Sequence, residues 1–394
     1  MLPLPLPLPL PLPLPLPLPL PLPLPLPLPL PLPLPLHPAS RVTTHPSTST
    51  MRAVLGRDAL GARTVGGIMI DTAAIYDKIR HLIPEVEWAV HEPLIAEINR
   101  LKTEVGAVIL AHNYQLPEVF HGVADITGDS LALAERAAEA EADVIVMCGV
   151  HFMAETAKIV NPDKTVLIPD LEAGCSLAES ITAADVRELR RRYPGVPVVT
   201  YVNTSAEVKA ETDVCCTSAN AVEVVESLGT DRVIFLPDEY LGRWVEANTE
   251  VEVILWTGCC EVHEKFTVAD VEAYRDQFPG VQVIAHPECR LDVLEAADLV
   301  GSTAGMIKYL SDHRPERVVM ITECSMSDNV SAEFPDIDFV RSCTICPHMK
   351  KITLESIVAA LKLGQFEVKV APDVAARALR AVERMLEVGR GERG

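Results

Sequence analysis

Two runs of the chain share one order of polar and apolar positions, and this order predicts a helix followed by a strand. The runs are TAADVRELRRRYPGVPVVTYVN, which begins at Thr182, and TVADVEAYRDQFPGVQVIAHPE, which begins at Thr267. Each starts with a threonine suited to capping a helix and has an acidic residue, Asp185 or Asp270, three positions later. An aromatic-Pro-Gly segment then predicts the helix end, and a Val-rich segment predicts a strand.

Polar side chains follow the predicted strands at matched places. The strand at 107–115, AVILAHNYQ, ends in His112 and Tyr114. The strands of the two runs above are followed by Tyr201 with Asn203 and by His286 with Glu288. A second strand end recurs in DVIVMCGV (143–150), DVCCTSAN (213–220) and ADLVGSTAGM (297–306), and helices begin beside Ser130, Ser218 and Thr303. In parallel sheets such residues gather beyond the carboxyl ends of strands, and helix N-termini there favour carboxylate or phosphate.

Three cysteines occur at the same place in this pattern. Cys175, Cys260 and Cys346 each lie seven residues before a threonine that begins an amphipathic run, and they are 85 and 86 residues apart (260 − 175 and 346 − 260). This period is too long for a solenoid repeat and is typical of a small βαβ-type domain. The sequence therefore predicts an α/β protein with three tandem related αβα sandwich domains, arranged with pseudo-threefold symmetry around a central cluster.

The predicted organisation has six parts. They are a Leu-Pro-rich leader (1–70), a helical lead-in (71–104), three α/β units (105–181, 182–266 and 267–352) and C-terminal helices (353–394). The leader alternates Leu and Pro over residues 2–36, which removes every second N–H and excludes a membrane helix. We expect either an unpacked, polyproline-II-like tail or a start codon placed too far upstream, with Met51 or Met69 as the start.

Composition narrows the class of protein. The 34 Lys and Arg against 55 Asp and Glu give a net charge of −21, which argues against a non-specific nucleic-acid surface. After the leader, the chain has no apolar run long enough to span a membrane. Ten cysteines in a chain of this length do not indicate a disulfide framework, and adjacent pairs such as Cys215-Cys216 suit reduced thiols. We therefore expect a cytoplasmic protein.

Three cysteines that converge on one point indicate a metal site or an iron–sulfur cluster with an open position for substrate. Cys259 competes with Cys260, and Cys343 with Cys346, but the seven-residue spacing favours Cys260 and Cys346. Cys343 could instead form a reversible disulfide with Cys346. The alternatives are an iron–sulfur electron carrier, which expects four cysteine ligands, a zinc-binding scaffold, for which the only Cys-x-x-Cys pair is weak support, and an α/β protein whose cysteines are buried and structural.

The chain from about 105 to 385 resembles quinolinate synthase, the second enzyme of de novo NAD biosynthesis from aspartate. The resemblance is carried by AHNYQLPEV, GDSLALAERA, GVHFMAETAKIVNP, AGCSLAE, VVTYVNTSAEVKA, CTSANAVEVV, FLPDEYLG, GCCEVHEKFT, AHPEC, GSTAGMIKY and CPHMKKITL. It implies one [4Fe–4S] cluster per chain, held by Cys175, Cys260 and Cys346. The implied reaction condenses iminoaspartate with dihydroxyacetone phosphate to quinolinate with loss of phosphate and water, and the iron without a protein ligand acts as Lewis acid.

The resemblance also implies the site residues. Substrate contacts carry over onto His112, Ser130, Tyr201, Asn203, Ser218, His286, Glu288 and Thr303, and Tyr114 and His263 match further active-site positions. We predict proton transfer by Glu288 with His286 and Tyr114, and we place His263 near the cluster. Iminoaspartate is chemically unstable, so functional coupling to L-aspartate oxidase is a further expectation.

Overall fold

Three four-stranded sheets follow one another along the chain, and every strand pairing within them is parallel. The computed structural model describes residues 63–65 and 68–389, so most of the predicted leader (1–70) lies outside the described residues. An antiparallel strand pair, β1 (Arg63–Val65) and β2 (Ile68–Ile70), precedes the sheets. The sheets consist of β3 (Ala107–His112), β4 (Ile126–Gly128), β5 (Val144–Cys148) and β6 (Thr165–Leu167); β7 (Val198–Tyr201), β8 (Val214–Cys216), β9 (Arg232–Leu236) and β10 (Glu252–Leu255); and β11 (Gln282–Ala285), β12 (Leu299–Val300), β13 (Arg317–Ile321) and β14 (Asp338–Val340).

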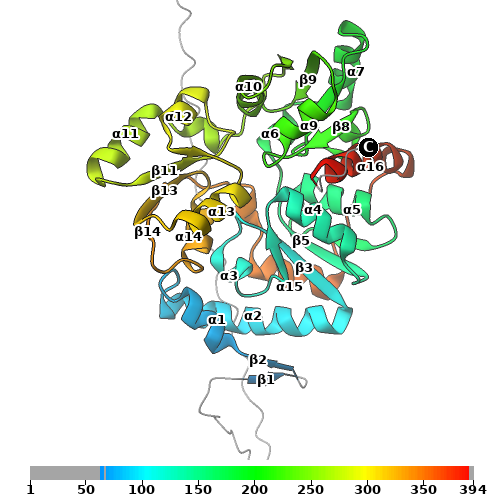
Figure 1. The fold of residues 1–394 in the computed structure, drawn as a ribbon. Coiled ribbons are helices and arrows are strands. Elements are labelled where there is room, and N and C mark those ends of the chain that lie inside the picture. The colour runs from blue at the N-terminus through cyan, green and yellow to red at the C-terminus, as the bar shows by residue number, and fades with distance from the viewer. Residues whose placement is uncertain (1–62, 66–67, 390–394) are drawn as a thin grey trace, which may run out of the picture. The chain divides into compact units, whose positions relative to one another are not determined.

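The three sheets share one topology. Their orders are β4-β3-β5-β6, β8-β7-β9-β10 and β12-β11-β13-β14, so the second strand of each set lies at an edge beside the first. This agreement is consistent with three repeated αβα units, as predicted (Figure 1). The pseudo-threefold arrangement and the unit boundaries stay predictions.

One equivalence drawn from the sequence was wrong. The segment 143–150 had been matched with 213–220 and 297–306, but the strand that shares the edge position of β8 and β12 is β4. β4 has only three residues, all partly or fully exposed, so it lacks the apolar run that marks a buried strand. β5 is largely buried between β3 and β6 and corresponds to β9 and β13. Ser130 nevertheless follows β4 as Ser218 follows β8 and Thr303 follows β12.

Helices connect the strands and flank the sheets. They are α1 (Thr72–Ile79), α2 (Glu85–Val105), α3 (Pro117–Phe120), α4 (Ser130–Glu139), α5 (His151–Val160), α6 (Ser176–Glu179), α7 (Ala183–Arg192), α8 (Ala206–Lys209), α9 (Ala221–Ser227), α10 (Glu239–Ala247), α11 (Val268–Gln277), α12 (Leu291–Ala296), α13 (Thr303–His313), α14 (Cys324–Ser331), α15 (Leu354–Leu363) and α16 (Pro372–Gly389), with the short 3₁₀ turns η1 (His263–Lys265) and η2 (Met349–Lys351). The predicted helical lead-in (71–104) contains α1 and α2. Among the described residues, no helix has both the length and the apolar character needed to cross a membrane.

The predicted threonine caps at Thr182 and Thr267 are confirmed, and Thr353 forms the same cap. Thr182, Thr267 and Thr353 each accept a hydrogen bond from the backbone N–H three residues on, and in each case a complete capping box is present. Such a cap satisfies two backbone groups that the first turn of a helix leaves unpaired. The helices α7 and α11 end at Tyr193 and Phe278, as the aromatic-Pro-Gly segments predict. The helix ends and the cysteines therefore keep one register through the chain.

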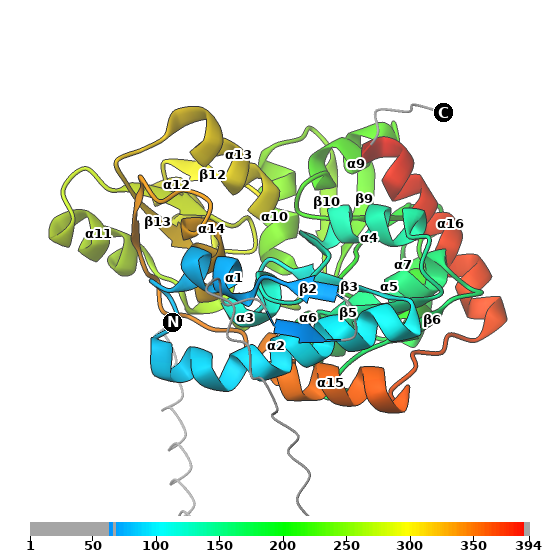
Figure 2. The ribbon, with the colours of Figure 1, turned by 90° about the horizontal axis from the view of Figure 1, so that it is seen from below.

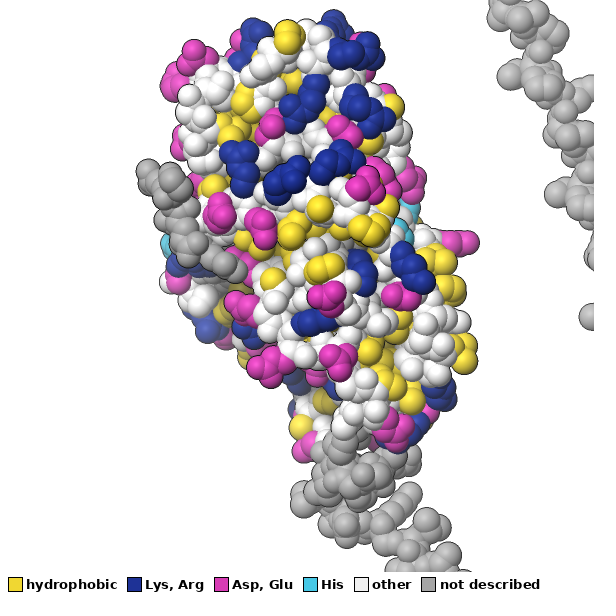
Figure 3. Space-filling view, turned by 90° about the vertical axis from the view of Figure 1, so that its right-hand side faces the viewer, with side chains coloured by type: hydrophobic (Ala, Val, Ile, Leu, Met, Phe, Trp, Pro, Cys, Tyr) yellow, Lys and Arg dark blue, Asp and Glu magenta, His cyan; other side chains and the backbone are white. Residues whose placement is uncertain are grey.

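Two long helices pack on the sheets from outside. α2 buries Ile95 and Ile98 and lies beside α15, which arrives from the other end of the sequence (Figure 2). α16 lies against β8, α8 and α5, and Arg377 donates to the backbone oxygen of Ala210 at 3.2 Å and to Glu211 at 2.9 Å. On the face that carries α16, Lys and Arg side chains gather in the upper part beside acidic side chains (Figure 3). The Arg377–Glu211 ion pair and the hydrogen bond from Arg384 to the backbone oxygen of Asp213 join α16 to the residues just before β8.

Side chains also join the first and third sheets. Asn113, just after β3, donates to the hydroxyl of Thr303 at 3.0 Å. Asn329 of α14 donates to the backbone oxygens of Asn113 at 3.0 Å and Gln115 at 2.8 Å. All of these groups are buried or nearly so, and a buried amide left without a partner would destabilise the fold. The loop that follows β3 is therefore fixed by the third part of the chain.

Candidate active site

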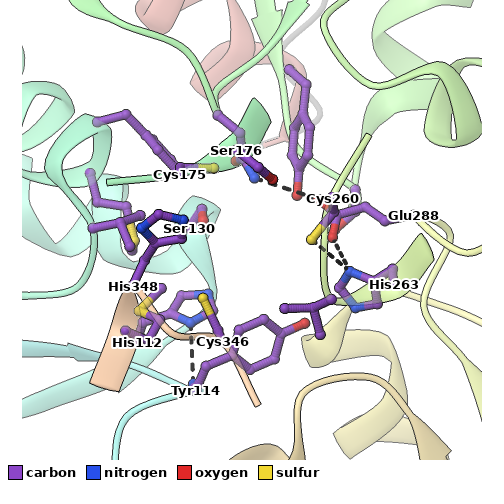
Figure 4. A pocket seen from close by; sticks show the side chains of 18 of the residues that line it. His112, Tyr114, Ser130, Cys175, Ser176, Cys260, His263, Glu288, Cys346 and His348 are labelled. Carbon is purple, nitrogen blue, oxygen red and sulfur yellow. Dashed lines mark hydrogen bonds and ion pairs between the residues drawn. The ribbon is translucent and has the colours of Figure 1, made fainter. Parts of the chain in front are cut away.

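One cavity, with about 730 Å³ of open space when the solvent at its mouth is included, is lined by every residue that the sequence predicts for the site. Figure 4 shows the labelled members of this set around a common space. The predicted residues that line it are His112, Tyr114, Ser130, Cys175, Tyr201, Asn203, Ser218, Cys260, His263, His286, Glu288, Thr303 and Cys346.

Equivalent strands deliver these residues. His112 and Tyr201 are the last residues of β3 and β7, and His286 directly follows β11, which has the same place in its sheet. Ser130 and Thr303 are the first residues of α4 and α13, whose N-terminal N–H groups therefore face the cavity edge. The cysteines follow the fourth strand of each sheet. The repeat thus brings three copies of one edge to one cavity.

The three cysteines share one local geometry. None of them forms a disulfide, and Figure 4 shows their sulfurs turned toward the same space. Burial raises the pKa of Cys175 to about 12 and raises the pKa of Cys260 and Cys346 above the usual range. Two backbone N–H groups act against this rise at each sulfur: those of Leu177 and Ala178 at Cys175, of Val262 and His263 at Cys260, and of His348 and Met349 at Cys346.

The competing cysteines lie elsewhere. Cys343 is exposed, and its thiol faces the backbone oxygen of Arg341 at 3.8 Å. Cys259 is partly buried but does not line the cavity. Cys343 also has φ at +57°, in the left-handed region that a non-glycine residue adopts at a cost. Only Cys260 and Cys346 of these pairs reach the cavity.

Glu288 is the centre of the polar groups in the cavity. Its Oε2 lies 2.6 Å from Nδ1 of His263, and its Oε1 accepts from the Asn203 amide at 3.5 Å. Burial, and next the charge of Glu288, raise the pKa of the Tyr201 hydroxyl well above its usual value. Burial by itself raises the pKa of Glu288, but the imidazoles of His263 and His286 outweigh burial and hold the pKa well below its usual range. Glu288 is therefore a buried carboxylate that stays ionised.

His112 and His286 are held as neutral rings. Burial lowers the pKa of His112 to about 3 and also lowers the pKa of His286, although Glu288 opposes the second shift. The backbone N–H two residues further on donates to Nδ1 of each ring, from Tyr114 at 3.2 Å and from Glu288 at 3.4 Å. In His286, Nδ1 also lies 3.4 Å from Oε2 of Glu288, and Nε2 lies 3.2 Å from the hydroxyl of Ser218. Each neutral ring has one nitrogen that donates and one that accepts a hydrogen bond.

Sequence reasoning missed Thr322. This fully buried residue follows β13, and its hydroxyl lies 2.7 Å from the Tyr114 hydroxyl and 2.9 Å from Nε2 of His263. It therefore connects Tyr114 through His263 to Glu288. Thr322 directly follows β13, so the strand-end position is the sequence signal that marks it.

Sequence reasoning also missed two polar residues that line the cavity itself. Glu261 and His348 come from the loops of Cys260 and Cys346 and approach to 2.8 Å at the cavity wall. Both are partly exposed. They link the second and third cysteine loops beside the cavity.

Comparison with known proteins identifies the family. Residues 96–387 match the family model described as quinolinate synthetase A protein. A curated protein of Mesorhizobium japonicum named quinolinate synthase 1 is 60% identical over 324 residues, which is 82% of this chain and 100% of that protein. The chain belongs to the quinolinate synthase family. The quinolinate synthase of Agrobacterium fabrum is 60% identical over 319 residues (81% of this chain, 92% of that protein), and that of Xylella fastidiosa is 61% identical over 294 residues (75% and 87%).

Quinolinate synthases are enzymes of NAD biosynthesis, so the resemblance drawn from the sequence is confirmed. The matched residues 96–387 include the three parallel sheets and all of the cavity residues named above. The family match thus covers the whole site.

Proposed function

We propose that the chain condenses iminoaspartate with dihydroxyacetone phosphate to give quinolinate, with loss of phosphate and water. The observation that carries the proposal is the meeting of three equally built cysteine loops and a set of polar strand-end residues at one cavity. A concave site with a few convergent polar groups is typical of small-metabolite binding. The proposal includes three α/β units at 105–181, 182–266 and 267–352, arranged with pseudo-threefold symmetry. It also includes a reducing cytoplasmic location, which suits ten free cysteines.

The cysteines fit an iron–sulfur cluster. Cys175, Cys260 and Cys346 offer three sulfurs to one space, and the paired backbone N–H groups at each sulfur favour thiolate over thiol. Burial raises the pKa of these thiols, so they lose their protons and become ligands only when a cation binds. Cluster iron is such a cation. A [4Fe–4S] cluster held by these three would supply one iron free of protein ligands as a Lewis acid.

A rival metal group exists in the same cavity. The ligand atoms of Cys260, His263 and Glu288 all lie within 4.8 Å of one another and could hold a single metal ion. We favour the three cysteines because His263 and Glu288 already pair with each other, and His263 also pairs with Thr322. Sulfide analysis separates the two, because a mononuclear site contains no inorganic sulfide.

Neutral donors are suited to bind the substrate carboxylates and phosphate. No Lys or Arg lines the cavity among the described residues. Hydroxyl and imidazole donors such as Ser130, Ser218 and His286, together with the N-terminal N–H groups of α4 and α13, supply partial positive charge instead. His112, Tyr201, Asn203 and Thr303 complete the proposed contacts.

Proton transfer is assigned to the ionised carboxylate and its connected partners. Glu288 can accept a proton from the carbon next to the imine, and His263 at 2.6 Å can hold or pass on that proton. Tyr114 keeps its hydroxyl proton because burial raises its pKa well above the usual value, so it serves as a donor to a leaving hydroxyl. Thr322 holds this hydroxyl in line with His263.

The test is an anaerobic assay of the purified chain. Iminoaspartate is supplied by L-aspartate oxidase with aspartate, because this unstable precursor must be made in place, and quinolinate is measured after addition of dihydroxyacetone phosphate. We expect quinolinate with the wild-type chain and none with Cys175→Ser, whereas Cys148→Ser, a buried cysteine outside the cavity, keeps activity. Quinolinate at equal rates from wild type and Cys175→Ser would reject the site. A higher yield when the oxidase shares the vessel than when its product is transferred would support functional coupling.

A further inference from the structure

An ion pair between a fully buried carboxylate and a partly buried ammonium lies beside the third cysteine loop. Nζ of Lys350, in η2, is 2.8 Å from Oε1 of Glu323, whose side chain is fully buried. The Lys350 ammonium also donates to the backbone oxygen of Tyr114 at 2.7 Å and to the hydroxyl of Ser325 at 2.6 Å. All three ammonium hydrogens therefore have acceptors. Neither Lys350 nor Glu323 lines the cavity.

The carboxylate of Glu323 is engaged equally fully. Oε1 accepts from the backbone N–H of Cys346 at 3.2 Å, and Oε2 accepts from the backbone N–H of Ser325 at 2.8 Å, which caps α14. One ion pair thus contacts the main chain at two site residues, Cys346 on the carboxylate side and Tyr114 on the ammonium side. These residues are 232 positions apart in the sequence (346 − 114).

The segment that carries Tyr114 has a second tie to the same region. Gln115 donates to the backbone oxygen of Met349 at 3.4 Å, so its side chain contacts the turn that contains Lys350. Asn329 of α14 holds the backbone oxygens on both sides of Tyr114. The loop after β3, the turn η2 and the start of α14 are therefore joined around the ion pair.

We propose that the Glu323–Lys350 pair is a positioning device that fixes the Cys346 loop and the Tyr114 segment relative to each other. The proposal rests on the proposed function, in which Cys346 holds the cluster and Tyr114 donates a proton. A buried pair with every hydrogen bond satisfied permits one geometry, and removal of one partner leaves an unpaired buried charge that both loops must accommodate. The pair acts through Cys346 and Tyr114 and has no contact of its own with the cavity.

The experiment compares Lys350→Met with Lys351→Met. Lys351 is the adjacent residue and pairs with Glu172 at 2.7 Å on the exposed surface, so it is a matched control. Hydrogen–deuterium exchange of the reconstituted protein is followed in peptides that cover 113–116 and 343–349. We expect Lys350→Met to speed exchange in both segments together, with β5 and α16 unchanged, and Lys351→Met to leave both segments as in wild type.

Iron release to a chelator is the second measurement. Groups that orient metal ligands typically change metal affinity about 10–100-fold when removed, so we expect Lys350→Met to release iron faster by about this factor. If Lys350→Met does not fold, Glu323→Gln/Lys350→Met removes both charges and is measured in its place, with the same loosening expected in both segments.

The outcomes separate the two proposals. Exchange in Lys350→Met that equals Lys351→Met, or that rises across the sheets as well, overturns the positioning role. Coupled loosening of the two segments in a protein that binds no iron would keep the positioning role and reject the cluster.

Discussion

Replacement of Thr322 by valine tests the connection between Tyr114 and Glu288. Thr322→Val keeps the volume of the side chain and removes its hydroxyl, which lies 2.7 Å from the Tyr114 hydroxyl and 2.9 Å from Nε2 of His263. Thr322 is fully buried and His263 is 1% exposed, so water does not readily replace the lost partner. One buried ring nitrogen left unsatisfied costs about 1–3 kcal/mol, and loss of the tyrosine contact adds about 0.5–1.5 kcal/mol. We expect the free energy of unfolding to fall by about 1.5–4.5 kcal/mol.

The effect on catalysis is expected to exceed the effect on binding. Tyr114 remains present in Thr322→Val but is no longer aligned, so we expect kcat to fall about 10–100-fold, which is about 1.4–2.8 kcal/mol of transition-state stabilisation. KM for dihydroxyacetone phosphate and the iron content should change little, because Thr322 does not line the cavity. The assay is anaerobic quinolinate formation under saturating substrate. Thr322→Ser, which keeps the hydroxyl, is the control and should retain most of kcat.

A double-mutant cycle decides whether Thr322 acts through Tyr114. In a Tyr114→Phe background the hydroxyl that Thr322 holds is already absent, so Thr322→Val should lower kcat little further. Full additivity of the two substitutions, or wild-type kcat in Thr322→Val, would refute the reasoning.

Two other perturbations are expected to act on binding and on acid stability. Ser218→Ala removes the hydroxyl that lies 3.2 Å from Nε2 of His286. We expect KM to rise about 3–10-fold, equivalent to about 0.5–1.5 kcal/mol, with a smaller change in kcat. The control Ser227→Ala, outside the cavity, should change neither constant. Burial lowers the pKa of His121 to about 4, so the folded state binds fewer protons there than the unfolded state, and stability is lost as pH falls from about 6.5 toward 4, by up to about 1.4 kcal/mol per pH unit. Urea unfolding across this pH range should show a shallower decline for His121→Gln, and an identical decline would contradict the assignment.

The local signals in the sequence predicted much of the fold because they depend on neighbouring residues. The threonine caps at 182, 267 and 353 and the helix ends at Tyr193 and Phe278 are set within a few residues, and all are observed. The equivalence of β4 was missed for the same reason, because three partly exposed residues carry no apolar pattern. Such a strand can be recognised only from its pairing with neighbouring strands, which the three-dimensional structure shows.

The cavity residues were predictable where the repeat or the family motifs marked them, and less so where tertiary contacts decide. Thr322 and Glu323 follow β13, and Lys350 follows Cys346. Thr322 and Lys350 both contact Tyr114, and Glu323 pairs with Lys350, so each contact joins residues that lie far apart in the sequence. Lys350 in particular is one of two adjacent lysines, and nothing local distinguishes it from the exposed Lys351. Burial of the charge becomes evident only when the loops meet.

The most direct test of the central claim is iron and inorganic sulfide content after anaerobic reconstitution, in three cysteine variants and two matched controls. The variants are Cys175→Ser, Cys260→Ser and Cys346→Ser. The controls are Cys259→Ser and Cys343→Ser, which change the cysteines close in sequence to Cys260 and Cys346 that do not line the cavity. We predict about four irons and four sulfides per chain in wild type and both controls, and loss of the intact cluster in each of the three variants. Iron without sulfide in the wild type, or equal loss in Cys343→Ser and Cys346→Ser, would contradict a cluster held by these three cysteines.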